Sequence, residues 1–203
     1  MRKRPLALLP LLLLLAGCGY NTIQTYDEQA SAAKSQIEVQ LQRRADLIPN
    51  LVNTVKGYAA HEEQVFTSVA QARAGLLNAI KTGDPQAMAD ANAGLTAGLG
   101  RLLAISEAYP QLKADQGFLR LQDELTGTEN RVAVSRRDYN QAAQQYNTYI
   151  RRFPATITAK VIGAKPKTYF EVTNPASREV PTVDFSKPTA SPQATPAQQP
   201  QVP

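Results

Sequence analysis

The sequence predicts an all-α protein: an antiparallel up-and-down four-helix bundle of long helices with an extended C-terminal segment. Two observations support this prediction. Apolar residues recur at alternating steps of three and four from Tyr20 to Phe153, a spacing that places them on one face of a helix. Prolines and a Gly83-Asp84-Pro85 tripeptide divide this stretch, because proline suits the first turn of a helix and disrupts its interior.

The first two predicted helices lie on either side of Pro49. The first covers residues 21–45, with Gln and Glu on the faces opposite its apolar positions. We expect a tight turn or sharp kink over residues 46–49, because a proline inside a helix costs ~3 kcal/mol. The second helix continues from Leu51 to Ile80 and ends before the Gly-Asp-Pro tripeptide, which is a strong signal for one helix to stop and another to start.

The third predicted helix covers residues 85–108 and contains Gly94, Gly98 and Gly100. Each glycine costs a helix up to about 1 kcal/mol relative to alanine, so we expect close packing against a neighbouring helix at these positions. After Tyr109-Pro110 the longest segment keeps a three-four apolar rhythm as far as Phe153. Such a seven-residue repeat predicts left-handed, coiled-coil-like packing.

These patterns divide the chain into four parts. Residues 1–17 form a signal peptide, residues 18–153 the helical bundle, residues 154–185 an extended segment packed on or following the bundle, and residues 186–203 a tail rich in Pro, Thr and Gln. We expect this tail to be disordered, because it has too little apolar bulk to offset the entropy lost on ordering.

The N-terminus has the pattern of a bacterial lipoprotein signal. Three basic residues at positions 2–4 precede an apolar run over residues 6–15, and Ala16-Gly17-Cys18 follows. The run is too short for a membrane-spanning helix, which needs ~20 residues. We therefore expect lipid attachment at Cys18, the single cysteine of the chain, and outer-membrane localisation facing the periplasm if the cell is Gram-negative, because Gly19 stands where an inner-membrane lipoprotein usually has Asp.

Composition and motifs argue against several functional classes. Removing the signal leaves 19 basic residues against 17 acidic ones, a net charge of +2 without a basic stripe, so we expect no nucleic-acid partner. His61 is the only histidine, and position 65, where a zinc-protease motif needs a second one, is Val. A di-iron bundle would need two Glu-x-x-His pairs. We expect no metal and no other cofactor.

Two charged clusters are the candidate site residues: residues 43–46 and residues 128–131. Solvent exposure is the simpler interpretation of both. The sharper hypothesis is a hydrogen-bonded polar layer on the buried seam, where Thr128 and Ser135 place hydroxyl groups and where such a layer would fix helix register. Its candidate members are Arg44, Asp46, Thr128, Glu129 and Arg131.

The chain resembles the LemA family of bacterial envelope proteins. The resemblance rests mainly on residues 37–52, with the sequence IEVQLQRRADLIPNLV, and it resumes at Tyr139-Asn140, Tyr146-Asn147, Phe153-Pro154 and Tyr169-Phe170-Glu171. It implies an antiparallel helical bundle held at the membrane with no established catalytic activity. Many relatives keep an uncleaved membrane helix where this chain has the lipoprotein pattern.

The expected function is that of a non-catalytic, lipid-anchored scaffold or interaction module outside the cytoplasm. It would contact the membrane through Cys18 and bind an envelope protein whose identity the sequence does not give; self-association stays open. The alternative is an envelope hydrolase or a cell-wall or ligand-binding protein. That alternative would use exposed carboxylates of the bundle, drawn from Glu38, Glu62, Glu63, Asp123, Glu124 and Glu129. Lipid sensing by the first helix is disfavoured by its modest apolar face.

Overall fold

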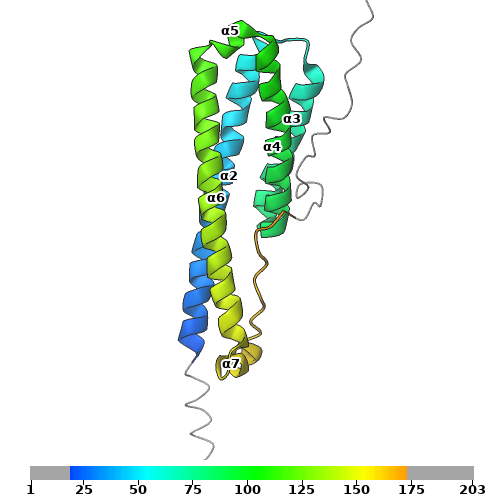
Figure 1. Cartoon of the computed structure of the whole chain (residues 1–203). Coiled ribbons are helices and arrows are strands. Elements are labelled where there is room, and N and C mark those ends of the chain that lie inside the picture. Colours follow the sequence, from blue (N-terminus) through cyan, green and yellow to red (C-terminus); the bar gives the residue numbers. More distant parts are fainter. Residues whose placement is uncertain (1–18, 173–203) are drawn as a thin grey trace, which may run out of the picture.

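The computed structural model describes residues 19–172, and all regular structure in this part of the chain is helical (Figure 1). The prediction of an all-α protein is therefore confirmed. The helices are α2 (Tyr20–Lys56), α3 (Glu63–Thr82), α4 (Pro85–Ala108), α5 (Pro110–Lys113), α6 (Gln116–Arg151) and α7 (Ala155–Val161). The predicted signal peptide with Cys18 and the predicted tail after position 185 lie outside the described residues.

The four long helices differ in length, and this difference shapes the molecule. Helices α2 and α6 have 37 and 36 residues and run antiparallel side by side, whereas α3 and α4 have 20 and 24 residues and form a shorter antiparallel pair against them (Figure 1). We call the part where all four helices lie together the wide half. The narrow half consists of the first turns of α2, the last turns of α6, and α7.

Helix α2 passes through Pro49 without a break, so of the tight turn or sharp kink predicted over residues 46–49, the turn is wrong. The proline ring is exposed, and the hydrogen bond that its missing N–H would make is one to the carbonyl oxygen of Ala45. That oxygen instead accepts a hydrogen bond from Arg73 Nε on α3, at 2.8 Å. The neighbouring helix therefore supplies the donor that the proline lacks, and the chain turns later, between Lys56 and Glu63.

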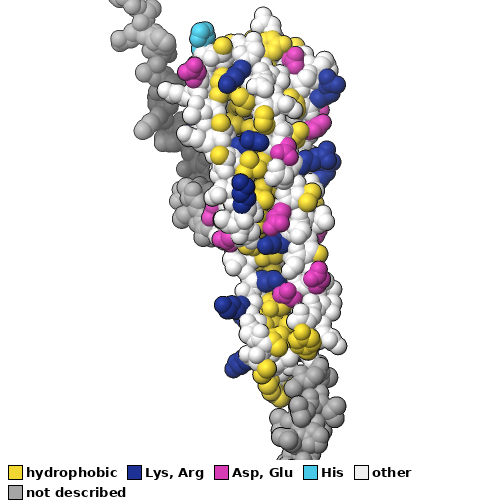
Figure 2. Space-filling view, turned by 180° about the vertical axis from the view of Figure 1, so that it is seen from behind, with side chains coloured by type: hydrophobic (Ala, Val, Ile, Leu, Met, Phe, Trp, Pro, Cys, Tyr) yellow, Lys and Arg dark blue, Asp and Glu magenta, His cyan; other side chains and the backbone are white. Residues whose placement is uncertain are grey.

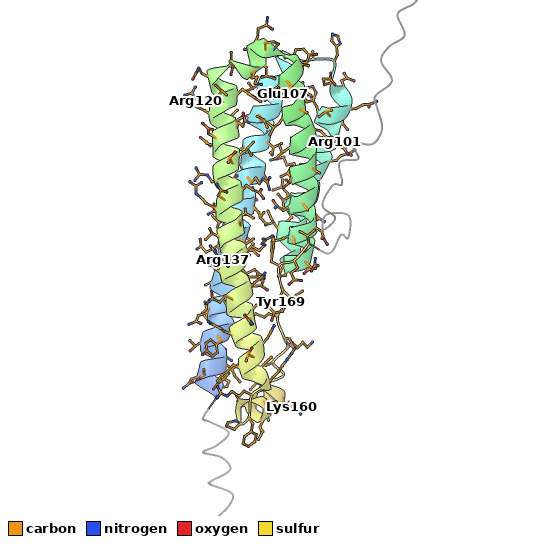
Figure 3. All side chains as sticks on the ribbon, in the orientation of Figure 1. Arg101, Glu107, Arg120, Arg137, Lys160 and Tyr169 are labelled. Atoms are coloured by element: carbon orange, nitrogen blue, oxygen red, sulfur yellow. The ribbon has the colours of Figure 1, made fainter. Side chains whose placement is uncertain are left out.

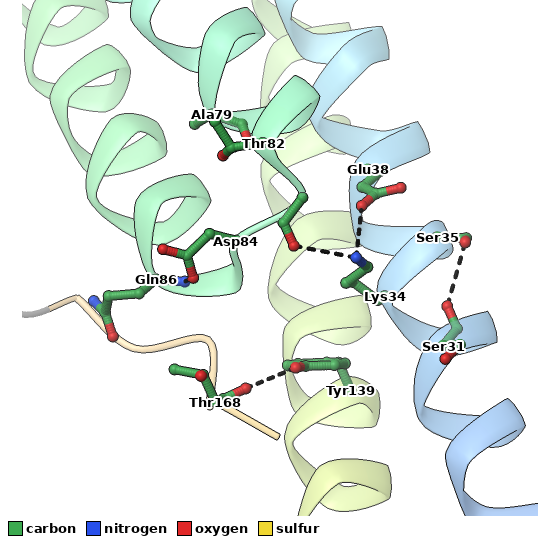
Figure 4. Close-up of polar contacts among 11 residues, drawn as sticks. Ser31, Lys34, Ser35, Glu38, Ala79, Thr82, Asp84, Gln86, Tyr139 and Thr168 are labelled. Carbon is green, nitrogen blue, oxygen red and sulfur yellow. Dashed lines mark hydrogen bonds and ion pairs between the residues drawn. The ribbon is translucent and has the colours of Figure 1, made fainter. Parts of the chain in front are cut away.

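The turn between α3 and α4 follows the prediction. Gly83 ends α3 with φ of 65°, a conformation that glycine adopts without strain, and Asp84 caps α4 by accepting a hydrogen bond from Gln86 N at 3.1 Å. Lys34 Nζ on α2 donates to the Gly83 carbonyl oxygen at 3.1 Å, which holds this turn against α2 (Figure 4). The turn marks the boundary between the wide and narrow halves.

Only one of the three α4 glycines makes the predicted close contact. A Cβ on Gly98 would lie 3.5 Å from Val69 Cγ2 and 3.9 Å from Ala72 Cβ, both on α3. Gly94 and Gly100 face open space, so for these two positions the prediction of close helix packing is wrong.

The buried apolar side chains form two separate clusters. The larger cluster fills the wide half, with Leu41, Leu76, Leu95 and Phe118 among its members, and it draws on α2, α3, α4 and α6. The smaller cluster lies in the narrow half and consists of Ile23, Tyr146, Ile150 and Ala159. Both clusters are needed to bury the apolar stripe that α2 and α6 carry along their whole length.

In the described part of the chain after α6, the predicted extended segment is wrong for residues 155–161, which are helical. Helix α6 ends at Arg151, and residues 155–161 form α7 with its Ala155, Thr158 and Ala159 side chains buried. Residues 164–172, which we call the strap, then run back along α6 without regular structure, as far as α4 (Figure 1).

Candidate functional site

Arg44 is the centre of a group of polar side chains that joins three helices of the wide half. Its side chain is only 4% exposed. Nη1 donates to Asn92 Oδ1 at 2.5 Å, Nη2 donates to Thr96 Oγ1 at 3.1 Å, and Nη1 also forms an ion pair with Glu129 Oε2. We call Arg44, Asn92, Thr96 and Glu129 the polar layer; its members come from α2, α4 and α6.

The electrostatics of the polar layer follow from burial. Burial lowers the pKa of the Arg44 guanidinium from its ordinary value, and the charge and hydrogen bond of Glu129 oppose that shift. A buried charge is costly unless it is paired and hydrogen-bonded. The layer therefore satisfies Arg44 mainly with groups from the neighbouring helices, and the partly exposed Glu129 carboxylate places one side of the layer near solvent.

The structure brings together two of the five predicted site residues, Arg44 and Glu129. Thr128 is fully buried, but its hydroxyl donates to the Leu125 carbonyl oxygen of its own helix, at 2.8 Å. Asp46 is exposed and accepts a hydrogen bond from Gln42 Nε2 at 2.8 Å.

Arg131 is also exposed, so neither Asp46 nor Arg131 belongs to the polar layer. The simpler interpretation, solvent exposure, therefore holds for these two residues. The sequence reasoning missed Asn92 and Thr96, which lie on a helix without a charged cluster. The available signal was an amide at position 92, in step with the buried apolar positions Met88, Leu95 and Leu99.

Surface grooves flank the polar layer. One of about 430 Å³ is lined by Asn92, Thr96, Glu129 and the strap residue Phe170, and another of about 320 Å³ is lined by Arg44, Thr96 and Glu129. A third groove, of about 640 Å³, lies between α2, α3 and α6 and is lined by three carboxylates together with Val39, Leu47 and Ile80. Those carboxylates are Glu38, Asp46 and Glu124.

A second set of polar contacts holds the strap on α6. Asn140 accepts from Phe170 N at 2.8 Å and donates to Phe170 O at 3.2 Å. Asn147, seven residues later, does the same with Lys167, at 2.7 and 2.9 Å. Each amide thus pairs with both backbone groups of one strap residue, in place of a neighbouring strand.

Two tyrosines and a lysine complete this attachment, which we call the clamp. Tyr139 donates its hydroxyl to the Thr168 carbonyl oxygen at 2.6 Å (Figure 4), and burial raises the pKa of Tyr139 to about 12. Lys167 Nζ lies 5.1 Å from the ring centre of Tyr146 and 2.9 Å from Asp27 Oδ1 on α2. The dipeptide Tyr-Asn, repeated seven residues apart, was the sequence signal for the clamp.

Two properties of residues 19–172 bear on their chemistry. In this part of the chain no three His, Cys, Asp or Glu side chains lie close enough to one another to hold a metal ion. None of its helices combines the length and the apolar character that crossing a membrane requires.

The chain has recognisable relatives among known proteins. The LemA family model matches residues 33–185. The chain is 31% identical to magnetosome protein MamQ 2 of Paramagnetospirillum magneticum over 175 residues, covering 75% of this chain and 64% of the relative. It is 30% identical to magnetosome protein MamQ of Magnetospirillum gryphiswaldense, covering 74% and 64%.

A more distant relative is protein LemA of Metamycoplasma hominis, which is 24% identical over 133 residues, covering 66% of this chain and 60% of the relative. The chain thus spans somewhat under two thirds of the length of each of these relatives. The matched region contains the polar layer and the clamp, and most of the helical part of the chain. This chain belongs to the LemA family.

Proposed function

We propose that this protein is a lipid-anchored, non-catalytic scaffold or interaction module outside the cytoplasm, attached to the membrane through Cys18. The observation that carries the proposal is the set of contacts made by the buried Arg44 side chain. Its guanidinium, the one charged side chain in the buried set of residues 19–172, hydrogen-bonds Asn92 and Thr96 and pairs with Glu129, and so joins three helices. A charge paired in this way supports a fixed helix register, because its two terminal nitrogens already have partners on the neighbouring helices.

The position of Gly19 supports a specific orientation on the membrane. Gly19 is buried beside Ala155 of α7, so the chain leaves the described structure at the end of the narrow half. Helix α2 has 37 residues and is therefore about 55 Å long. A lipid on Cys18 would hold the narrow half at the bilayer and present the wide half, as an antiparallel four-helix bundle, away from it.

Two of the relatives are named magnetosome proteins. A scaffold role for those proteins would accord with the proposal, in which the partner of this chain is an envelope protein that contacts the wide half. The anchor needs two or more acyl chains for stable binding, as bacterial lipoprotein modification provides.

The test is in-cell photo-crosslinking of the full chain. A photoreactive residue at Val39, exposed on the wide half, is compared with one at Gln145, exposed on the narrow half, in chains with Cys18 and with Cys18→Ala. We expect membrane flotation and one defined envelope partner at position 39 that is lost with Cys18→Ala. Absence of lipid on Cys18, or equal capture at both positions, would contradict the proposal.

The groove with three carboxylates favours a second candidate, a cell-wall or ligand-binding function. Glu38 and Glu124 line that groove, although Glu38 also lies 3.6 Å from Lys34 Nζ. The test is binding of purified cell-wall sacculi by the Glu38→Gln/Glu124→Gln chain and by a matched Glu62→Gln/Glu63→Gln chain. Selective loss of binding in the first would replace the scaffold proposal.

A further inference from the structure

We infer that the end of the narrow half is a membrane-binding surface that inserts apolar side chains into a bilayer and contacts its anionic headgroups. We call this surface the tip; it consists of Phe153, Ile157 and Val161 with Arg152, Lys160 and Lys165. The inference deepens the proposed function, and it rests on the anchor at Cys18 only for the direction in which the tip faces.

The apolar part of the tip is unusually exposed. Phe153, Ile157 and Val161 are 74%, 50% and 82% exposed. Ile157 and Val161 are four residues apart on α7 and therefore share a face, and Phe153 lies in the turn that leads into α7. Single exposed apolar residues are ordinary on a protein surface, but a cluster of large ones indicates an interaction site.

Helix α7 is inverted relative to a surface helix in water. The face that packs against the protein carries Ala155, Thr158 and Ala159, whereas the larger apolar side chains point outward. A surface helix ordinarily buries its largest apolar residues. The reversal indicates that the outer face of α7 meets an apolar medium.

The charges of the tip indicate which apolar medium the outer face of α7 meets. The sequence has no acidic residue between Asp138 and Glu171, and Arg152, Lys160 and Lys165 are all exposed within that interval. Figure 3 shows Lys160 on α7 at the lower end of the molecule, and Figure 2 shows hydrophobic side chains at the same end with basic groups on its flank. Apolar residues bordered by lysine and arginine are typical of surfaces that lie in the headgroup region of an anionic membrane.

The position of the tip also indicates a bilayer as its partner. A Cβ on Gly19 would lie 3.4 Å from Ala155 Cα and 3.5 Å from the Tyr149 hydroxyl, so the described chain begins beside α7. An acyl anchor and a basic apolar surface at the same end of a protein act together, because the anchor keeps the surface at a high effective concentration near the lipid. The bilayer is therefore the occupant that the tip fits.

The first experiment uses the absence of tryptophan from the sequence. Full-length lipidated chains with Ile157→Trp, or with Val134→Trp on the exposed face of α6 in the wide half, are reconstituted in vesicles of phosphatidylethanolamine and phosphatidylglycerol. We expect brominated lipids to quench the fluorescence of the residue at position 157 and to shift its emission to the blue, with neither effect at position 134. Water-like, unquenched emission at both positions would overturn the inference.

The second experiment tests the contact between the basic side chains of the tip and anionic headgroups. Charge reversal of Arg152, Lys160 and Lys165 to Glu should reduce quenching at position 157 in phosphatidylglycerol vesicles and leave it unchanged in phosphatidylcholine vesicles. A matched reversal of Arg120, Arg131 and Arg137, exposed along α6, should leave the quenching unchanged in both. An equal loss of quenching from the two reversals would contradict a specific contact at the tip.

Other outcomes of these experiments would contradict the inference or the anchor. A blue shift without quenching by brominated lipid would identify a second copy of the chain as the occupant of the tip. Flotation of the chain with the vesicles is measured in parallel. Flotation without quenching would overturn this inference and leave the anchored scaffold standing, whereas a chain that lacks lipid on Cys18 yet is quenched at position 157 would contradict the anchor alone.

Discussion

The wide and narrow halves contain the same two long helices but stabilise them differently. In the wide half α3 and α4 cover α2 and α6, so the shared core includes many large aliphatic side chains that are fully buried. In the narrow half only α7 and the strap cover the pair, and the cluster has four residues. Two helices alone bury little apolar surface, so the narrow half relies on hydrogen bonds and aromatic contacts for the remainder.

The comparison shows how the long pair of α2 and α6 is supported where α3 and α4 no longer cover it. Asn140, Asn147 and Tyr139 form hydrogen bonds with the backbone of the strap, and Tyr26 packs edge-on against Tyr149 with ring centres 5.3 Å apart. Hydrogen bonds fix the position of the strap but contribute little to the free energy of folding, whereas burial of a large apolar core contributes much more. We therefore expect the narrow half to be the less stable of the two.

Truncation of a buried core side chain should give the largest difference between the two halves in the free energy of unfolding. Leu41→Ala in the wide half should lower the free energy of unfolding by about 2–5 kcal/mol, because it leaves a cavity among fully buried side chains. Ile23→Ala, equally buried on the same helix, should cost less globally, because the narrow half can open locally. Chemical denaturation measures the first effect and amide hydrogen exchange the second. Equal global costs would mean that the halves unfold as one unit.

Alkaline pH should release the clamp at the boundary between the halves. Burial raises the folded-state pKa of Tyr139 to about 12 from an ordinary value of 10.0. Its contribution is therefore fully present below pH 10 and is lost as the pH rises towards 12, by an amount on the order of 2–3 kcal/mol. Free energies of unfolding measured across this range should fall more steeply for the parent chain than for Tyr139→Phe. Identical slopes would contradict the prediction.

Removing Glu129 should test the polar layer. Glu129→Ala leaves the buried Arg44 guanidinium with Asn92 and Thr96 alone, which should cost about 1–3 kcal/mol of stability. Arg131→Ala, on an exposed side chain of the same helix, is the control and should change stability by less than about 0.5 kcal/mol. Thermal and chemical denaturation give both values. A larger effect of Arg131→Ala would restore that residue to the candidate site.

The smallest loss of stability should come from removal of one side-chain amide of the clamp. Asn147→Ala removes two hydrogen bonds to Lys167, and because the strap can then detach into water the net cost should be about 1 kcal/mol. Faster hydrogen exchange of the Lys167 amide is the direct measurement. Gln145→Ala, exposed on the same turn of α6, should leave that exchange unchanged. Unaltered exchange in Asn147→Ala would show that the core contact of Phe170 holds the strap without the amides.

Much of the fold was predictable because it depends on local rules. The three-four apolar repeat determined the helices and their buried faces, and Gly83-Asp84-Pro85 determined where α3 ends and α4 begins. At the candidate site, Arg44 and Glu129 were recognisable as charges close to a buried seam. The other partners of Arg44, Asn92 and Thr96, were not recognised, because they are neutral residues on a helix 48 and 52 positions from Arg44.

Other features were decided only by contacts between distant parts of the chain. The local preference of proline predicts a break in α2 at Pro49. The helix nevertheless continues, because Arg73 on α3 donates a hydrogen bond to the Ala45 carbonyl oxygen. The attachment of the strap to Asn140 and Asn147 likewise depends on residues 20 and 30 positions apart. The sequence by itself determined the all-helical class, the apolar faces of the long helices and the turn between α3 and α4, since periodicity and capping act within a few residues. The tertiary structure decided the division into two halves and the hydrogen-bond partners of Arg44, Asn140 and Asn147, because both depend on which surfaces meet.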